Sequence, residues 1–211
     1  EVADIKTADQ LHLPTPQVEY HNVVAQPTEI QKEMVQALSE RASQVHSGTV
    51  DPSQDNMLKI TSDGRKLGLD QRIINQLLPD EPGTKVNQCV NNIMQIWQDG
   101  EAGKLTQLVF CDISTPQARP AQKAAKALDN PTLHALENTV PLPEPEPAFT
   151  VYEDIRQKLI AKGVPAEQIA FIHEANTEVR KKELFSKVRT GQVRVLLGST
   201  QTMGAGTNVQ D

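Results

Sequence analysis

The first clear pattern of apolar and polar positions along the chain is helical and covers residues 28–46. Thr28 and Gln31 have the spacing of a capping box, in which each side chain accepts a hydrogen bond from the other residue's backbone N–H. The apolar residues that follow recur at steps of three and four, which predicts an amphipathic helix. These residues are Ile30, Met34, Leu38, Ala42 and Val45.

The rest of the first hundred residues also favours helices. The stretch from Leu67 to Leu78 is predicted to form one helix, and apolar residues on one face predict another from Val86 to Trp97, ending near Gly100. Val18–Val24 is a candidate strand. Residues 1–100 are therefore expected to form a mostly helical region that precedes the main domain.

The second half alternates short apolar runs with helical patterns. Gln107–Cys111 is predicted to be a buried strand, and two further strands are predicted at 168–172 and 193–197. Helices are predicted from Phe149 to Lys162 and from Asn176, as the capping residue, to Val188. Strands and helices alternating at this spacing imply right-handed parallel crossovers. The fold class is thus predicted to be α/β, a parallel sheet flanked by helices on both faces.

Small and hydroxylated residues follow the last predicted strand. Gly204 and Gly206 would let the backbone approach a phosphate closely, and nearby hydroxyls could donate hydrogen bonds to its oxygens. These hydroxyls belong to Ser199, Thr200, Thr202 and Thr207. Ligands of parallel sheets meet the carboxyl ends of the strands, where Ser114 and His173 are also expected. An ordinary turn between a strand and a helix is the alternative interpretation of residues 204–208.

The order of these segments resembles the second lobe of superfamily-two helicases and Swi/Snf-type DNA translocases. Residues 199–208 read S-T-x-x-x-G-x-G-x-N, which looks like motif V of that family, and Gln107–Ser114 resembles motif IV. Phe149–Gly163, Gln168–Ala175 and Arg180–Val188 are similar to the elements between them. The resemblance covers about residues 105–211 and is closest to helicase and DNA-methylase proteins of bacterial mobile elements.

The resemblance implies a RecA-like helicase C-terminal lobe over residues 101–211, truncated after motif V, and assigns roles to particular residues. Contacts to nucleic acid are implied for Ser114, Thr115, His173, Arg180, Ser199, Thr200 and Thr207. Coupling to the nucleotide is implied for Gly204, Gly206 and Asn208. Simpler interpretations stay open for two of them: His173 could be structural, and Arg180 with its two neighbouring lysines could be a solvated helix face.

The family's other catalytic parts do not occur in this sequence. It contains no G-x-x-x-x-G-K-[ST] phosphate loop and no acidic box after a strand. The resemblance implies that ATP and Mg²⁺ act in the intact protein, that DNA is the main partner, and that the first RecA-like lobe belongs to the same parent chain. The chain is thus expected to be a piece of a longer protein, to bind neither cofactor stably, and to hydrolyse no ATP alone. RNA is not separated from DNA by the sequence.

Composition and charge limit the classes of protein to which this chain can belong. The net charge is −6, which disfavours a general binder of nucleic acids, yet residues 149–211 hold nine Lys and Arg against seven Asp and Glu. Cys89 and Cys111 lie far apart without histidines at ligand spacing, so neither a disulfide framework nor a metal site is indicated. A cytoplasmic protein with no membrane segment is expected. The oligomeric state is not indicated.

One segment interrupts the predicted lobe. Residues 115–148 separate the motif IV strand from its helix and contain a run of alternating prolines from Pro141 to Pro147. Such a run is extended and polyproline-like, and is interpreted as a solvated linker or as a motif that docks a partner. A rival function follows from the second interpretation: a non-catalytic, helicase-like docking module within a large polyvalent protein.

Overall fold

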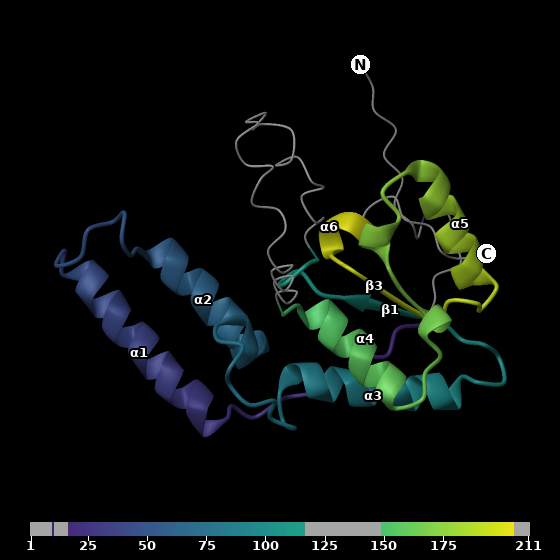
Figure 1. Cartoon of the computed structure of the whole chain (residues 1–211), viewed down its shortest axis with the longest axis horizontal. Coiled ribbons are helices and arrows are strands. Elements are labelled where there is room, and N and C mark those ends of the chain that lie inside the picture. Colours follow the sequence, from purple (N-terminus) through teal and green to yellow (C-terminus); the bar gives the residue numbers. More distant parts are fainter. Residues whose placement is uncertain (1–9, 11–16, 117–148, 205–211) are drawn as a thin grey trace, which may run out of the picture.

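The fold is α/β, with a parallel three-stranded sheet and helices on both of its faces (Figure 1). A computed structural model of the chain describes Gln10, residues 17–116 and residues 149–204. The proline-rich part of the predicted insertion and the predicted site residues Gly206, Thr207 and Asn208 lie outside the described residues.

The sheet consists of β1 (Gln107–Phe110), β2 (Ile169–Phe171) and β3 (Val195–Gly198) in the order β1-β3-β2. Both neighbours pair with β3 in parallel, so that Leu196 lies opposite Leu108 on one side and Ala170 on the other. The three strands and their parallel arrangement confirm the sequence prediction. All three carboxyl ends meet at one edge of the sheet.

The face of the sheet that bears Val195 and Leu197 is covered by α3 (Lys85–Asp99) and α4 (Val151–Ala161). Thr84 and Thr150 begin these helices by accepting hydrogen bonds from the backbone N–H groups of Asn87 and Glu153. The apolar side of each helix supplies the larger of the two cores. Its helical members are Val86, Val90, Ile93, Met94, Val151, Tyr152, Ile155 and Leu159.

The opposite face is covered by α5 (Glu178–Arg189) and the short α6 (Thr200–Met203). Thr177, and not the predicted Asn176, caps α5 by accepting a hydrogen bond from the N–H of Arg180. The second core contains Ala170, Ile172, Val188, Val193, Leu196 and Met203. These helices pack over β2 and β3.

On that same face β1 is left partly bare. Leu108 and Phe110 alternate with Gln107 and Val109, and their side chains are 39% and 50% exposed. The prediction of a buried strand here was therefore wrong for these two residues. The apolar run of β1 was interpreted as burial on both faces, whereas the described residues bury only one.

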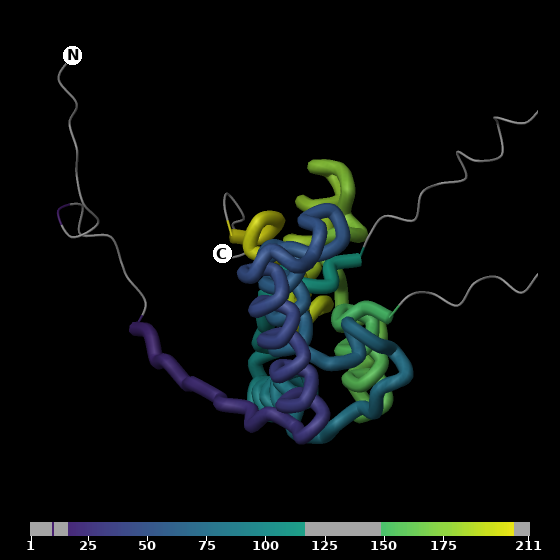
Figure 2. The backbone as a smooth tube through the Cα atoms, turned by 90° about the vertical axis from the view of Figure 1, so that its left-hand side faces the viewer, coloured from purple at the N-terminus to yellow at the C-terminus, as the bar shows by residue number. Residues whose placement is uncertain are grey.

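The helices before α3 form a hairpin of α1 (Glu29–His46) and α2 (Met57–Leu69) that extends away from the sheet (Figure 1). The predicted capping box of Thr28 and Gln31 is confirmed. The two helices lie next to each other in Figure 1 and overlap in Figure 2, which is turned toward the hairpin, so they pack side by side. The candidate strand at Val18–Val24 does not form: this segment is exposed and pairs with no strand among the described residues.

The prediction of one helix from Leu67 to Leu78 was wrong. α2 ends at Leu69, and a 3₁₀ turn, η1 (Gln71–Ile73), follows it. Asp70 separates the two because its buried side chain accepts a hydrogen bond from the N–H of Arg72, which caps η1 instead of extending α2. The start of α1 is joined to the end of α2 at this point, because Nε2 of Gln31 donates a hydrogen bond to the carbonyl of Leu67 at 3.0 Å.

A network of charges joins η1 to the lobe. The Arg72 guanidinium donates to Asp70 and, from 82 residues away in sequence, to both carboxylate oxygens of Asp154 on α4, at 2.8 and 3.0 Å. Lys158 reaches Asp154 at 2.8 Å and Asp80 at 2.7 Å. Asp70 is fully buried, and Arg72 is 8% exposed. The network holds the helical region against α4.

A second buried arginine joins α3 to the sheet. Arg194 lies just before β3, is fully buried, and donates to the backbone carbonyls of Trp97 at 2.6 Å and Leu105 at 3.2 Å. It also pairs with Glu101, and its guanidinium lies 5.0 Å from the centre of the Trp97 ring. One side chain thereby serves carbonyls at the end of α3 and in the loop that leads into β1.

Among the described residues, no helix is both long and apolar enough to cross a membrane.

Candidate functional site

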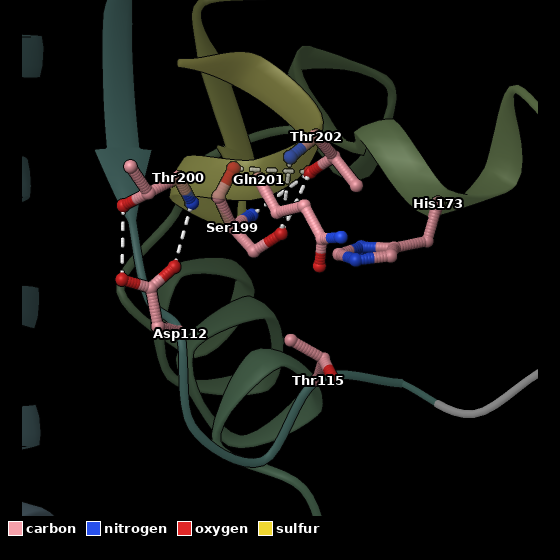
Figure 3. Close-up of a pocket in the computed structure, with 7 residues that line it drawn as sticks. All are labelled: Asp112, Thr115, His173, Ser199, Thr200, Gln201 and Thr202. Atoms are coloured by element: carbon pink, nitrogen blue, oxygen red, sulfur yellow. Dashed lines mark hydrogen bonds between the residues drawn. The ribbon is translucent and has the colours of Figure 1, made fainter. Parts of the chain in front are cut away.

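The carboxyl ends of the three strands surround a pocket of about 540 Å³ (Figure 3). Its wall is formed by residues that follow β1, β2 and β3, which are far apart in the sequence. Five of them were named as candidate ligands from the sequence, namely Thr115, His173, Ser199, Thr200 and Thr202. The others are Asp112 and Gln201. The parallel sheet thus brings together groups that the sequence analysis could only assign separately.

Asp112 and Thr200 form the tightest polar contact of this pocket. The backbone N–H of Thr200 donates to Oδ1 of Asp112 at 2.6 Å, and the Thr200 hydroxyl donates to Oδ2 at 2.9 Å. Figure 3 shows both bonds closing the gap between the segment after β1 and the start of α6. The Thr200 donors, expected to meet a phosphate, are therefore held by a carboxylate of the same chain.

The turn after β3 is set by its own side chains. Ser199 caps α6 by accepting a hydrogen bond from the N–H of Thr202, and the two hydroxyls lie 3.0 Å apart. Gly198 is required here because a Cβ atom on it would lie 2.6 Å from both Cγ2 of Ile172 and Sδ of Met203. The absent side chain lets α6 pack closely on the end of the sheet, which fixes the hydroxyls at the pocket wall.

Ser114 adopts a positive φ of 60°, and its hydroxyl accepts a hydrogen bond from the N–H of Val151 at 3.0 Å. It therefore helps to start α4, and it does not line the pocket among the described residues. Thr115, the next residue, does. In Figure 3 Thr115 lies on the opposite side of the pocket from Ser199.

His173 lies in the 3₁₀ turn η4 (Ile172–Glu174), directly after β2. Its ring points toward Gln201 in Figure 3 and meets the Tyr152 ring edge-on, with 5.3 Å between the ring centres. Its Nδ1 atom is buried and finds no hydrogen-bond partner within the described part of the chain. Burial lowers the pKa of His173, and the nearby Glu174 carboxylate offsets this only in part. The imidazole is therefore neutral at physiological pH.

We expect His173 to titrate below its ordinary pKa of 6.5, because burial disfavours the imidazolium. Since the unfolded chain then binds more protons than the folded chain, stability should fall as the pH drops from about 6.5 through the folded pKa. NMR titration of the His173 Cε1–Hε1 signal measures this, with His173→Gln identifying the signal. A midpoint at or above the ordinary value would contradict the buried, unpartnered ring.

The remaining predicted site residues lie elsewhere or outside the described residues. Arg180 is exposed on the first turn of α5, where it donates to Oδ1 of Asn176 at 3.2 Å, and it does not line the pocket. Gly204 ends α6 with an ordinary negative φ of −80°. A Cβ atom at Gly204 would lie 2.4 Å from the Thr200 carbonyl oxygen, so close packing within its own turn accounts for this glycine.

Asp112 is the pocket residue that sequence reasoning missed. The available signal was its position, directly after the predicted strand Gln107–Cys111 and two residues before Ser114. The sequence analysis considered only hydroxyls and glycines as phosphate ligands and therefore omitted a carboxylate. The carboxyl ends of parallel strands place any polar side chain that follows them at the same edge of the sheet. Gln201 was missed in the same way as a wall residue, whereas Thr202 was among the hydroxyls expected to meet a phosphate.

The pocket's chemistry is that of hydroxyls, one amide, one carboxylate and a neutral imidazole. Its described lining contains no Lys or Arg. No group of three or more His, Cys, Asp or Glu side chains suited to a metal ion occurs among the described residues. Such a wall can hold a polar ligand through hydrogen bonds. A polyanion would need its positive charges from outside the pocket.

Comparison of the chain with protein-family models, with curated proteins and with solved structures finds no match. The function proposed below therefore rests on the residues and their geometry.

Proposed function

We propose that this chain contributes the second, RecA-like lobe of an ATP-dependent DNA helicase or translocase, and that the pocket at the strand ends contacts the nucleic-acid backbone. The observation that carries the proposal is the convergence of Thr115, His173, Ser199 and Thr200 on one pocket from three separate strand ends. Open parallel sheets bind ligands at this edge. The motif order over residues 105–211 supplies the family.

The proposal assigns the chain only part of a motor cycle. Phosphoryl transfer needs a lysine, Mg²⁺ and carboxylates that position the nucleotide, and these belong to the phosphate loop and acidic box that this sequence does not contain. ATP and Mg²⁺ would accordingly be held mainly by another lobe. The role left to this chain is to bind the nucleic-acid backbone and to change that contact when ATP is hydrolysed.

The basic side chains that such a role needs lie on α5, the helix that follows η4 and the pocket residue His173. Arg180, Lys182, Lys187 and Arg189 are exposed on this helix, with Glu178 and Glu183 as exposed acidic residues. Lys and Arg supply the sequence-independent affinity of proteins for DNA, while hydroxyls and backbone N–H groups fix its position. We propose this division between α5 and the pocket.

We expect the chain to bind a fluorescein-labelled 20-nucleotide oligo(dT) weakly, with affinity that falls as salt rises. Arg180→Ala should reduce the affinity by roughly three- to tenfold and lower the salt slope by about one, because one phosphate contact is lost. Fluorescence anisotropy across a salt series measures both quantities. Arg65→Ala, which removes one positive charge from the exposed side of α2, is the matched control and should change little.

No binding by the wild-type chain at low salt, together with none to a duplex or an RNA of the same length, would refute the nucleic-acid role. Tighter binding to RNA than to DNA would support the proposed lobe and would change its proposed substrate from DNA to RNA.

The docking module stays as a second candidate because apolar side chains stand exposed on the helical region. Leu58 is 83% exposed, Leu77 93% and Met57 51%. Exposed apolar groups of this kind are common at surfaces that bind other proteins. A docking module should be indifferent to Arg180→Ala, so the same anisotropy series separates the two functions.

A further inference from the structure

Asp112 presents the pocket with the wrong charge for the proposed ligand. It supplies the carboxylate of the wall, while His173 is neutral and the other lining side chains are uncharged. A phosphate entering this space would meet a negative charge at its closest donors. The arrangement either excludes anions or requires Asp112 to yield to them.

The contacts of Asp112 show which donors are at stake. Its two oxygens accept the N–H and the hydroxyl of Thr200 at 2.6 and 2.9 Å, a two-point geometry that two phosphate oxygens could also adopt. Thr200 follows β3, whereas Asp112 follows β1, 88 residues earlier. The contact therefore occupies the Thr200 donors and also clamps two strand ends together.

We propose that Asp112 sets the affinity of this site by acting as an internal competitor for the phosphate: backbone binding at Thr200 proceeds only as Asp112 releases it. This inference rests on the proposed nucleic-acid contact. A competitor of this kind keeps the grip weak and reversible, which suits a lobe that must let go of the strand in each cycle. It also couples ligand binding to the segment from Asp112 to Thr115, which leads from β1 along the pocket wall.

Two substitutions at Asp112 separate its charge from its occupancy of the donors. In Asp112→Asn the side chain can still accept the Thr200 N–H and donate to the Thr200 hydroxyl, so the fold is kept while the charge is removed. Asp112→Ala removes the charge and frees both donors. Asp51→Asn, in the connection between α1 and α2, removes the same unit of charge far from the pocket; in the described contacts the Asp51 side chain accepts hydrogen bonds from Ser53 only.

The test is anisotropy of the labelled 20-nucleotide oligo(dT) with the full chain, at one low and one moderate salt concentration. We expect Asp112→Asn to tighten binding roughly three- to tenfold and Asp112→Ala at least as much, because a unit charge within about 5 Å of a phosphate opposes it by about that factor. Asp51→Asn should change affinity less than twofold. Urea unfolding of each variant reports any loss of the clamp.

The possible outcomes distinguish failure of this inference from failure of the proposed function. If the wild-type chain binds in a salt-dependent manner and neither Asp112→Asn nor Asp112→Ala binds more tightly, the competitor is refuted and the proposed function stands. If the wild-type chain binds and Asp112→Asn binds more tightly, both are supported. If no protein binds, the proposed function fails and the inference fails with it. Should Asp112→Ala be unfolded, Asp112→Asn alone decides, because it keeps both hydrogen bonds.

Discussion

Replacing Arg194 by Ala is expected to lower the free energy of unfolding by about 3–5 kcal/mol, a large part of the stability of a typical domain. The side chain is fully buried, and its guanidinium donates to the carbonyls of Trp97 and Leu105 as well as to Glu101. Removing it leaves two carbonyls without their donor and opens a cavity beneath the Trp97 ring. Unsatisfied buried carbonyls cost about 1–3 kcal/mol each.

Urea unfolding followed by far-ultraviolet circular dichroism measures this loss. Trp97 fluorescence is a second probe, because it is the one tryptophan of the chain. Arg194→Met is the control: it keeps most of the aliphatic volume and lacks the donors, so its loss should lie between those of the wild type and Arg194→Ala. Equal stability of Arg194→Met and the wild type would mean that packing, and not hydrogen bonding, holds this position.

The parts of the fold that the sequence predicted depend on local patterns. The capping box of Thr28 and the face from Val86 to Trp97 are contained within one helix each, and the residues of β3 are buried on both faces, as a continuous apolar run indicates. Such patterns are readable because the interacting positions are three, four or two residues apart. The strand ends followed from the same runs, which is why five pocket residues were found.

The parts that failed depend on distant partners. The apolar pattern continues from Leu67 to Leu78, yet α2 stops at Leu69 because the buried Asp70 bonds Arg72, which in turn needs Asp154 on α4. Asp112 is similar: its role depends on the register of β1 against β3, which places Thr200 within its reach. No spacing along the chain contains that information.

Replacing Arg72 by Ala is expected to cost about 3–5 kcal/mol, because it breaks a buried pair and leaves Asp70 charged, fully buried and without its partner. Asp154 would lose both of its hydrogen bonds from Arg72, and the cation would no longer lie over the Phe149 ring, 4.7 Å from its centre. The hairpin of α1 and α2 should then separate from the sheet and its covering helices more easily than either part unfolds.

Arg41→Ala is the matched control for this experiment. Arg41 also pairs with two aspartates, Asp55 and Asp63, but it lies on the hairpin with 36% of its side chain exposed. Exposed pairs contribute at most about 1 kcal/mol, so this substitution should cost far less than Arg72→Ala. Equal losses would show that the buried network at η1 is no more important than a surface pair.

The same network makes the free energy of unfolding depend on pH in the acidic range. Burial raises the pKa of Asp80. Hydrogen bonds from Lys158 and Asn87, together with the positive charges of Arg72 and Lys158, lower it by more, so the pKa lies below its ordinary value of 3.8. A carboxylate with a lowered folded pKa stabilises the fold above its unfolded pKa and loses that contribution as the pH falls through the folded value. Urea unfolding between pH 7 and pH 3 should therefore show a decline that is shallower in Arg72→Ala, because one of the charges that lowers the pKa of Asp80 has gone. A decline as steep as that of the wild type would mean that Lys158 and Asn87 lower the pKa of Asp80 without Arg72, and that Arg72 acts through Asp70 and Asp154 only.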